Sequence, residues 1–194
     1  MKDIILNILD ESIRVKDASI KNNLDLLIRT AERIAECMTS GHKLLIFGNG
    51  GSAADAQHLA AEFVNRFRIE RPPLAAIALT TDTSILTSIG NDYHFDEVFS
   101  KQIIAVGRKD DIAVGISTSG NSGNVIKAME AAKSADMFTI GLTGRGGKLA
   151  ECSDTIFKVD SDVTARIQET HITMGHVLCD LVDRILFPGV KHDS

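Results

Sequence analysis

The feature that most constrains how this chain folds is an alternation of short apolar runs with longer helical segments, from residue 43 to residue 187. Apolar strands that alternate with helices are typical of a parallel sheet covered by helices on both faces. We therefore expect a three-layer α/β/α sandwich with a parallel sheet of about five strands. The predicted strands are 43–47, 74–79, 112–116, 138–142 and 155–159, and the predicted helices are 52–67, 83–89, 95–106, 123–134, 147–151 and 165–187.

The segment before the first strand predicts a helical extension. Apolar residues between positions 3 and 38 recur at helical spacing, and Ser40-Gly41 ends the pattern. Two helices in this place would cap the domain or pack against another subunit. Because no repeat or long linker divides the chain, we expect one domain over 1–194, with 1–40 as its N-terminal extension.

Composition excludes several classes of function. The formal net charge of −5 argues against a general nucleic-acid surface. No run approaches the roughly 20 apolar residues of a membrane helix, and acidic residues interrupt the N-terminal segment where a secretory signal would need an apolar core. The cysteines Cys37, Cys152 and Cys179 are far apart and form no disulfide framework. We expect a cytoplasmic protein with reduced thiols and no membrane partner.

Two loops at the carboxyl ends of predicted strands have the character of phosphate sites. In Gly48-Asn49-Gly50-Gly51-Ser52, the glycines allow close backbone approach to a ligand, and the next helix offers free N–H groups. A tight strand-to-helix turn explains this loop equally well. The other loop, 117–123, holds four hydroxyl groups, on Ser117, Thr118, Ser119 and Ser122. One or two would suit an ordinary cap and turn, whereas four favour an anion site.

Candidate acid–base groups lie on two predicted helices. His58 and Glu62 are four residues apart and share one helical face, although an ordinary solvated face remains possible. The last helix has an apolar stripe that includes His171, which we interpret as a core histidine. A second face also contains apolar and small residues, so we expect it to be buried in a subunit interface, with His176 inside it. This second face consists of Gln168, Ile172, Gly175, His176, Cys179 and Asp183.

These motifs resemble a known family. GNGGSA followed by D-A-Q-H-x-x-x-E, then GISTSGNSGNVIKA, then TARIQETH and a further His, is similar to the sugar isomerase (SIS) domain family and, within it, to the phosphoheptose isomerases. The resemblance covers about residues 4–187. The ISTSGNS segment marks only the broad domain, whereas the combination of His58, Glu62, Gln168 and His176 points to the isomerases.

The resemblance implies an aldose–ketose isomerase that converts D-sedoheptulose 7-phosphate to D-glycero-D-manno-heptose 7-phosphate through an enediol. It implies a homotetramer with sites between subunits and a product that supplies lipopolysaccharide core or another surface glycan. Glu62 suits the base and His176 the acid of the proton transfer. The implied substrate contacts are Asn49, Gly50, Gly51, Glu62, Asn91, Asp92, Ser117, Thr118, Ser119, Ser122 and Gln168.

The same resemblance implies one zinc ion per subunit, held by His58, Glu62, Gln168 and His176. Spacing alone leaves this open, because glutamine is an uncommon zinc ligand. Whether Glu62 is the base, a metal ligand or both also stays open.

Some features leave room for other interpretations. Asn91-Asp92 lies in a turn-like GNDYH segment, Arg66 could reach a phosphate or be an ordinary surface residue, and Ala165 stands where some relatives have Asp. The alternatives are a non-catalytic SIS-domain tetramer that binds a replication initiator protein, a phosphosugar-sensing regulator, and an isomerase of another phosphosugar. The presence of Glu62 and His176 favours the enzyme.

Overall fold

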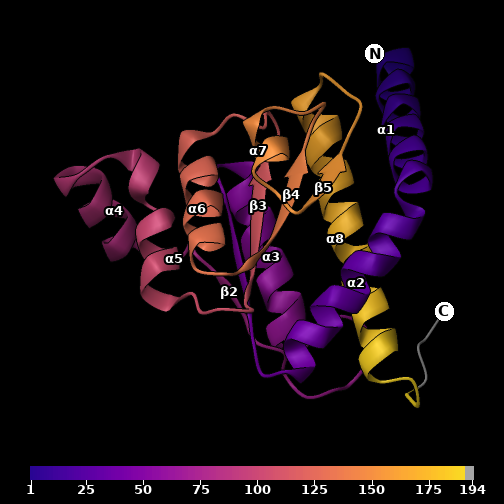
Figure 1. Cartoon of the computed structure of the whole chain (residues 1–194). Helices are drawn as coiled ribbons and strands as arrows, with labels where there is room; N and C mark the ends of the chain where they lie inside the picture. The colour runs from indigo at the N-terminus through magenta and orange to yellow at the C-terminus, as the bar shows by residue number, and fades with distance from the viewer. Residues whose placement is uncertain (191–194) are drawn as a thin grey trace.

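The computed structural model describes residues 1–190 and contains a five-stranded sheet of order β2-β1-β3-β4-β5 (Figure 1). All neighbouring strands are parallel. The predicted parallel sheet is therefore confirmed, with small shifts at strand ends. The strands are β1 (Leu44–Gly48), β2 (Ala76–Ala78), β3 (Ile112–Ser117), β4 (Phe138–Thr143) and β5 (Thr155–Lys158).

Helices cover both faces of this sheet, which confirms the three layers. The helices are α1 (Lys2–Asn22), α2 (Leu24–Thr39), α3 (Gly51–Val64), α4 (Thr83–Asp92), α5 (Ser100–Val106), α6 (Gly123–Ser134), α7 (Lys148–Glu151) and α8 (Thr164–Leu186). Side chains alternate along each strand, so Leu44 and Ile46 join one core with α2, α3 and α8, while Leu45 and Phe47 join another with α5, α6 and α7.

Three predicted helix boundaries are wrong. The helix expected at 95–106 is divided into a 3₁₀ turn, η1 (Phe95–Glu97), and α5, with the buried Val98 and Phe99 between them. The helix expected at 52–67 ends at Val64. The supposed turn at Asn91-Asp92 is the last turn of α4, because Tyr93 N–H still donates a helical hydrogen bond to Ile89 O.

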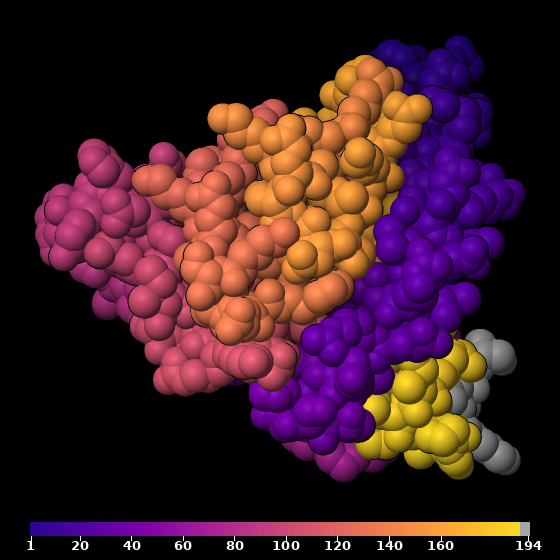
Figure 2. All heavy atoms as spheres, in the orientation of Figure 1, coloured from indigo at the N-terminus to yellow at the C-terminus, as the bar shows by residue number. Residues whose placement is uncertain are grey.

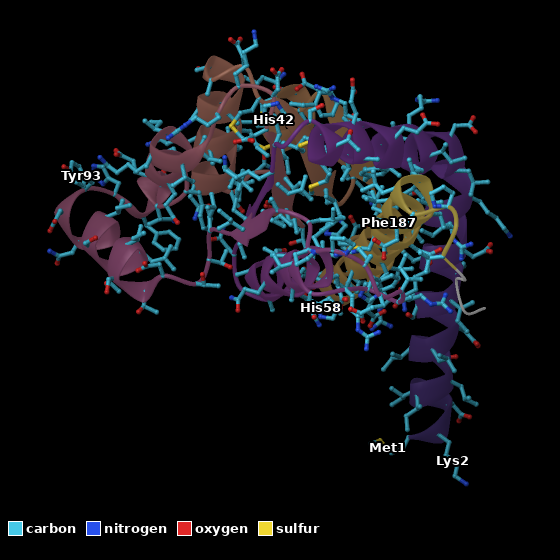
Figure 3. The ribbon with its side chains drawn as sticks, turned by 90° about the horizontal axis from the view of Figure 1, so that it is seen from below. Met1, Lys2, His42, His58, Tyr93 and Phe187 are labelled. Atoms are coloured by element: carbon cyan, nitrogen blue, oxygen red, sulfur yellow. The ribbon has the colours of Figure 1, made fainter. Side chains whose placement is uncertain are left out.

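The predicted N-terminal extension is present as α1 and α2. α1 is attached to the start of α8, where Arg166 donates to Ile8 O at 2.7 Å and Ser12 donates to Glu169 at 2.6 Å. Its first turns, with Met1 and Lys2, project from the body (Figure 3). The first two helices form a band along one side of the surface (Figure 2). Within residues 1–190, no helix is both long and apolar enough to cross a bilayer.

α8 differs from its predicted environment on its second face. Gly175, Cys179 and Asp183 are buried within this chain, where Gly175 packs on Leu59 of α3 and Asp183 pairs with Arg71. These three residues need no partner subunit to cover them, and the interface expected around His176 stays a prediction. A Cβ atom on Gly175 would lie only 2.9 Å from Leu59 Cδ1 and closer still to Cδ2. The missing side chain therefore lets α8 approach α3 closely.

The other face of α8 contains the core histidine that the sequence predicts. His171 is 1% exposed, and its Nε2–H donates to Thr143 O at 3.0 Å. Burial lowers the pKa of His171 to about 4, a change that its hydrogen bond only partly offsets. The side chain is therefore neutral at physiological pH and joins α8 to the end of β4.

This histidine makes stability depend on pH. Its pKa is about 4 when folded and about 6.5 when unfolded, so its neutral form favours folding fully above pH 6.5. That contribution is lost as pH falls towards 4. Between pH 7 and pH 4, we expect wild type to lose about 3 kcal/mol more unfolding free energy than His171→Gln, which retains an N–H donor without titrating. Urea unfolding at both pH values measures this, and equal losses in the two proteins would exclude His171 as the source.

Candidate active site

The candidate site begins where the strand order reverses direction. β1 and β3 are neighbours at the centre of the sheet, and their connections leave towards opposite sides. In open α/β sheets, ligands bind outside the carboxyl ends of the strands at such a switch point. The glycine loop follows β1 and the serine loop, residues 117–123, follows β3. The sheet therefore brings the two predicted phosphate-type loops side by side.

A reciprocal amide pair fixes these loops to each other. Asn49 Nδ2 donates to Asn124 Oδ1 at 2.8 Å, and Asn124 Nδ2 donates to Asn49 Oδ1 at 2.8 Å. Asn124 is 2% exposed and lies in the first turn of α6. The Asn49 side chain is thus already engaged by protein, and any contact it makes with a substrate would share these groups.

Three of the four predicted hydroxyl groups of the serine loop lie close together. Ser117 Oγ lies 2.9 Å from Ser122 Oγ and 3.4 Å from Ser119 Oγ. Ser122 is the N-cap of α6, yet its side chain makes no capping hydrogen bond. Its hydroxyl is directed into the loop, which leaves the first amides of α6 without a side-chain cap. Uncapped amides and clustered hydroxyls are the groups that bind phosphate at helix N-termini.

A cavity of about 510 Å³ opens beside this loop. Thr118 and Ser119 line it on one side, and Thr164 and Ile167 of α8 line it on another. Arg145 is at its edge, where its guanidinium donates to Asp160 at 2.7 Å and to Asp162 at 2.6 Å. Arg145 was not predicted as a site residue, because a glycine-flanked arginine after a strand resembles an ordinary surface turn.

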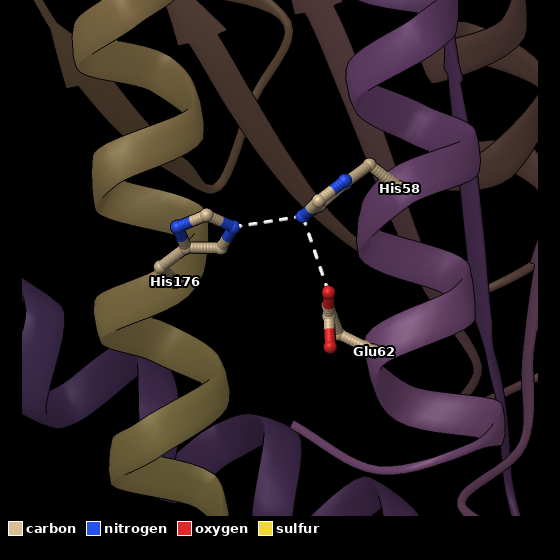
Figure 4. Close-up of side chains that lie close together, drawn as sticks. All are labelled: His58, Glu62 and His176. Carbon is tan, nitrogen blue, oxygen red and sulfur yellow. Dashed lines mark hydrogen bonds and ion pairs between the residues drawn. The ribbon is translucent and has the colours of Figure 1, made fainter. Parts of the chain in front are cut away.

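The second part of the site is a cluster on α3 and α8, two helices far apart in sequence (Figure 4). His58 Nε2 lies 2.9 Å from His176 Nε2 and 3.2 Å from Glu62 Oε1. His58 and Glu62 project from the same face of α3, as predicted, and meet His176 within one chain. The close packing of α3 and α8 is sufficient to bring His176 to this pair without a partner subunit.

The surroundings of His176 favour its neutral imidazole. Partial burial lowers the pKa of His176, the nearby His58 lowers it further, and Glu62 partly opposes both effects. The His176 ring also contacts Phe67, with ring centroids 5.3 Å apart. A neutral ring retains a lone pair on one nitrogen, which can accept a proton or bind a metal ion.

The donor set fits a divalent metal ion. One ligand atom from each of His58, Glu62 and His176 lies within 4.8 Å of the other two. Zinc bonds of about 2.0–2.2 Å in a tetrahedral shell place ligand atoms roughly 3.3 Å apart, close to the distances in the cluster. Two imidazoles and a carboxylate are also the three protein ligands of several catalytic zinc sites. The residues present therefore suit zinc.

Comparisons with known proteins agree with this geometry. The family described as the SIS domain matches residues 9–144. The phosphoheptose isomerase of Nitratidesulfovibrio vulgaris is 58% identical over 181 residues, covering 93% of this chain and 87% of that protein. The one from Thermodesulfovibrio yellowstonii is 54% identical over 194 residues, covering 98% and 96%. The chain belongs to the phosphoheptose isomerase family of SIS-domain proteins.

Solved structures of the family have the same architecture. The phosphoheptose isomerase of Neisseria gonorrhoeae is 50% identical, with a TM-score of 0.89 over 94% of this chain and 98% of that one. The enzyme from Francisella tularensis is 40% identical, with a TM-score of 0.90 over 94% and 97%. The SIS fold expected from the sequence motifs is therefore confirmed.

Not all residues that the family resemblance implies come together in one chain. The Gln168 amide points at Gly51, where an added Cβ would lie 2.8 Å from Gln168 Cδ. Gly51 is about 10 Å along α3 from His58 at 1.5 Å per residue, so a fourth metal ligand at Gln168 stays a prediction. Gly50, with a positive φ of 55°, forms the turn before Gly51.

Three other candidates lie away from this site. Asn91 and Asp92 are exposed and hydrogen-bonded to each other at the end of α4, which packs mainly against η1. The neighbouring Tyr93 is at one end of the molecule, well separated from His58 (Figure 3). Arg66 follows the far end of α3 and pairs with Glu70 at 3.7 Å. Arg66 is thus remote from the serine loop of its own chain.

The structure adds one carboxyl group next to the cluster that was not predicted from the sequence. Asp55 lies three residues before His58 on α3, and its Oδ2 is buried without a hydrogen-bond partner among the described residues. Burial raises the pKa of Asp55, and the neighbouring His58 partly opposes this. The i, i+3, i+7 spacing of Asp55, His58 and Glu62 was the available signal.

Proposed function

We propose that this protein is a phosphoheptose isomerase that converts D-sedoheptulose 7-phosphate to D-glycero-D-manno-heptose 7-phosphate. The observation that carries this proposal is a carboxylate and two imidazoles meeting on α3 and α8, beyond a hydroxyl-lined loop at the switch point of the sheet. The relatives with this name are 54% to 58% identical over nearly the whole chain.

The separation of the two parts of the site supports a long phosphosugar. Gly51 begins α3 beside the serine loop, and His58 lies about 10 Å further along the helix. A phosphate at the loop would direct the other end of an extended sugar towards His58, Glu62 and His176. A three-carbon sugar phosphate is too short for this arrangement, whereas a seven-carbon sugar reaches the cluster.

The chemistry needs one proton to move between C1 and C2 of the sugar. Glu62, whose side chain is 22% exposed, would take the proton from carbon. His176 would donate to and accept from the sugar oxygens as the enediol forms and collapses. Ser117, Thr118, Ser119 and Ser122 would hold the phosphate together with the first amides of α6. The backbone of Asn49, Gly50 and Gly51 would contact the sugar beside them.

The proposed metal is one zinc ion per subunit, held by His58, Glu62 and His176, with Gln168 as the predicted fourth ligand. When bound there, zinc supplies Lewis-acid polarisation of the sugar oxygens at C1 and C2. Glu62 is then both a candidate ligand and the candidate base.

The proposed assembly is a homotetramer with active sites between subunits. α1 exposes a long apolar surface, with Ile5 64% and Ile13 56% exposed. Asn91 and Asp92 are remote from the cluster of their own chain, so a role in substrate binding requires a neighbouring subunit. We also propose a cytoplasmic location, which agrees with the three free thiols, and a role in supplying heptose for lipopolysaccharide core or another surface glycan.

The first prediction separates catalysis from substrate binding. In Glu62→Gln, kcat should fall about 10²–10⁴-fold because the base is lost, while sedoheptulose 7-phosphate should still raise the melting temperature. The matched variant Ser119→Ala removes an exposed hydroxyl from the phosphate loop, so KM should rise while kcat is retained. Coupled assays give both constants, and NMR follows solvent deuterium entering the substrate at C1 or C2.

Three results would contradict this assignment. Equal deuterium exchange in wild type and Glu62→Gln would remove Glu62 from the base role. No exchange by wild type with any phosphoheptose would favour the alternative of a non-catalytic SIS-domain protein that binds a replication initiator. Exchange only with a hexose phosphate would favour the isomerase of another phosphosugar.

The second prediction concerns the metal ion. Protein purified without chelator should contain about one zinc per chain by elemental analysis. His58→Ala should lose the metal, because it removes one of the proposed ligands. The fold should be retained, because the His58 side chain is half exposed. His171→Gln alters a histidine outside the cluster and should retain it. Full turnover by verified metal-free wild type would refute the proposal.

The third prediction concerns assembly. Light scattering should give a mass of about four chains for wild type. Ile5→Glu places a charge on the apolar face of α1 and should lower this mass, whereas Asn7→Glu, on a polar position of the same helix, should not. A wild-type monomer that is fully active at micromolar concentration would contradict a site shared between subunits.

A further inference from the structure

A buried arginine caps the end of α3 that bears Glu62. The Arg71 side chain is 1% exposed. Its Nη2 donates to Glu62 O at 2.8 Å, and its Nη1 donates to Phe63 O at 2.7 Å and to Asn65 O at 3.3 Å. The last carbonyl groups of a helix lack partners within the helix, and a cation at this end is favoured by the helix dipole. Arg71 therefore fixes the backbone of Glu62 itself.

The counter-charge of this arginine comes from the helix that bears His176. Arg71 Nε donates to Asp183 Oδ1 at 2.8 Å, and Asp183 is 2% exposed. Asp183 follows His176 by seven residues, or about two turns of α8. Its other oxygen, Oδ2, has no hydrogen-bond partner among residues 1–190. The guanidinium is thus a bridge between the end of α3 and α8.

A second contact joins the same helices on the other side of the cluster. Leu59 packs on Gly175, one turn before Glu62 on α3 and directly before His176 on α8. Along the two helices, Glu62 and His176 therefore lie between an apolar contact on one side and the Arg71–Asp183 ion pair on the other. Movement of α3 relative to α8 would disturb both contacts, so together they determine how far the Glu62 carboxylate lies from the His176 ring.

We propose that Arg71 and Asp183 are positioning residues that set the spacing between Glu62 and His176. This inference rests on the proposed function, because it assigns a purpose to that spacing. Arginine suits this role better than lysine, since its planar fork binds the carboxylate and several carbonyl groups at once. Neither residue touches the proposed substrate position, so they act through Glu62 and His176.

The test compares conservative variants with a matched buried ion pair elsewhere. Arg71→Lys keeps the charge but loses the fork, and Asp183→Asn keeps the shape but loses the charge. The control is Asp111→Asn, which weakens the pairing of a 1% exposed carboxylate with Lys43 at the amino ends of β1 and β3. All proteins are assayed at a temperature where each is fully folded by circular dichroism.

We expect kcat to fall at least tenfold in Arg71→Lys and Asp183→Asn relative to Asp111→Asn, with KM for sedoheptulose 7-phosphate within threefold of wild type. Gly175→Ala changes the same spacing from the other side and should also lower kcat, which keeps the test available if an ion-pair variant does not fold. Losses of kcat smaller than tenfold in the folded variants would overturn the proposal. A purely structural ion pair, like that of the control, should affect stability and leave the kcat of the folded protein unchanged.

Hydrogen–deuterium exchange provides a readout that does not depend on turnover. Arg71→Lys should speed exchange in the last turn of α3, residues 61–65, while Asp111→Asn should leave that segment as in wild type. Unchanged exchange there would overturn the anchoring role even in an active enzyme. If the wild-type α3 amides are protected and the variant amides are not, but wild type isomerises no phosphoheptose, the proposed function is refuted while the anchoring role stands. The two failures are therefore distinguishable.

Discussion

The close approach of α3 to α8 is the constraint on which the rest of the site depends. The two helices are more than a hundred residues apart in sequence, and His58, Glu62 and His176 meet only because the helices pack without a side chain at Gly175. A methyl group there would overlap the Leu59 side chain, so Leu59 or the two helices would have to shift. A gap of a single methyl group is comparable to the tolerance of hydrogen bonding and metal coordination. Backbone packing thus decides whether these three side chains can act together.

The sheet contributes the other half of the geometry. Its order places β1 and β3 side by side, so the glycine and serine loops leave the same edge with their helices starting nearby. Neither loop contains a lysine or arginine. An anion held there depends on oriented dipoles and hydroxyl groups, which retain their direction because the strands beneath are buried. The ionisable side chains His58, Glu62 and His176 lie instead at the cluster, some distance along α3.

The sequence was sufficient to predict the layers, the strands, the shared face of His58 and Glu62, and the core position of His171, because each is encoded in local periodicity. It could not identify what covers the second face of α8, since burial by α3 and burial by another subunit produce the same pattern of apolar residues. Arg71 escaped notice for a similar reason, because a charged residue before two prolines resembles a surface loop until Asp183, 112 residues away, is placed beside it.

The amide pair between Asn49 and Asn124 has a consequence for the conditions under which the site keeps its shape. Both side chains are neutral and neither titrates in the physiological range, so the link between the loops is indifferent to ionic strength and to acidification. In an ion pair at the same place, the cationic side chain could bind a phosphate instead of its carboxylate partner, and the link between the loops would then be broken. The neutral amide pair keeps the two loops in the same relative position whether or not an anion is bound beside it.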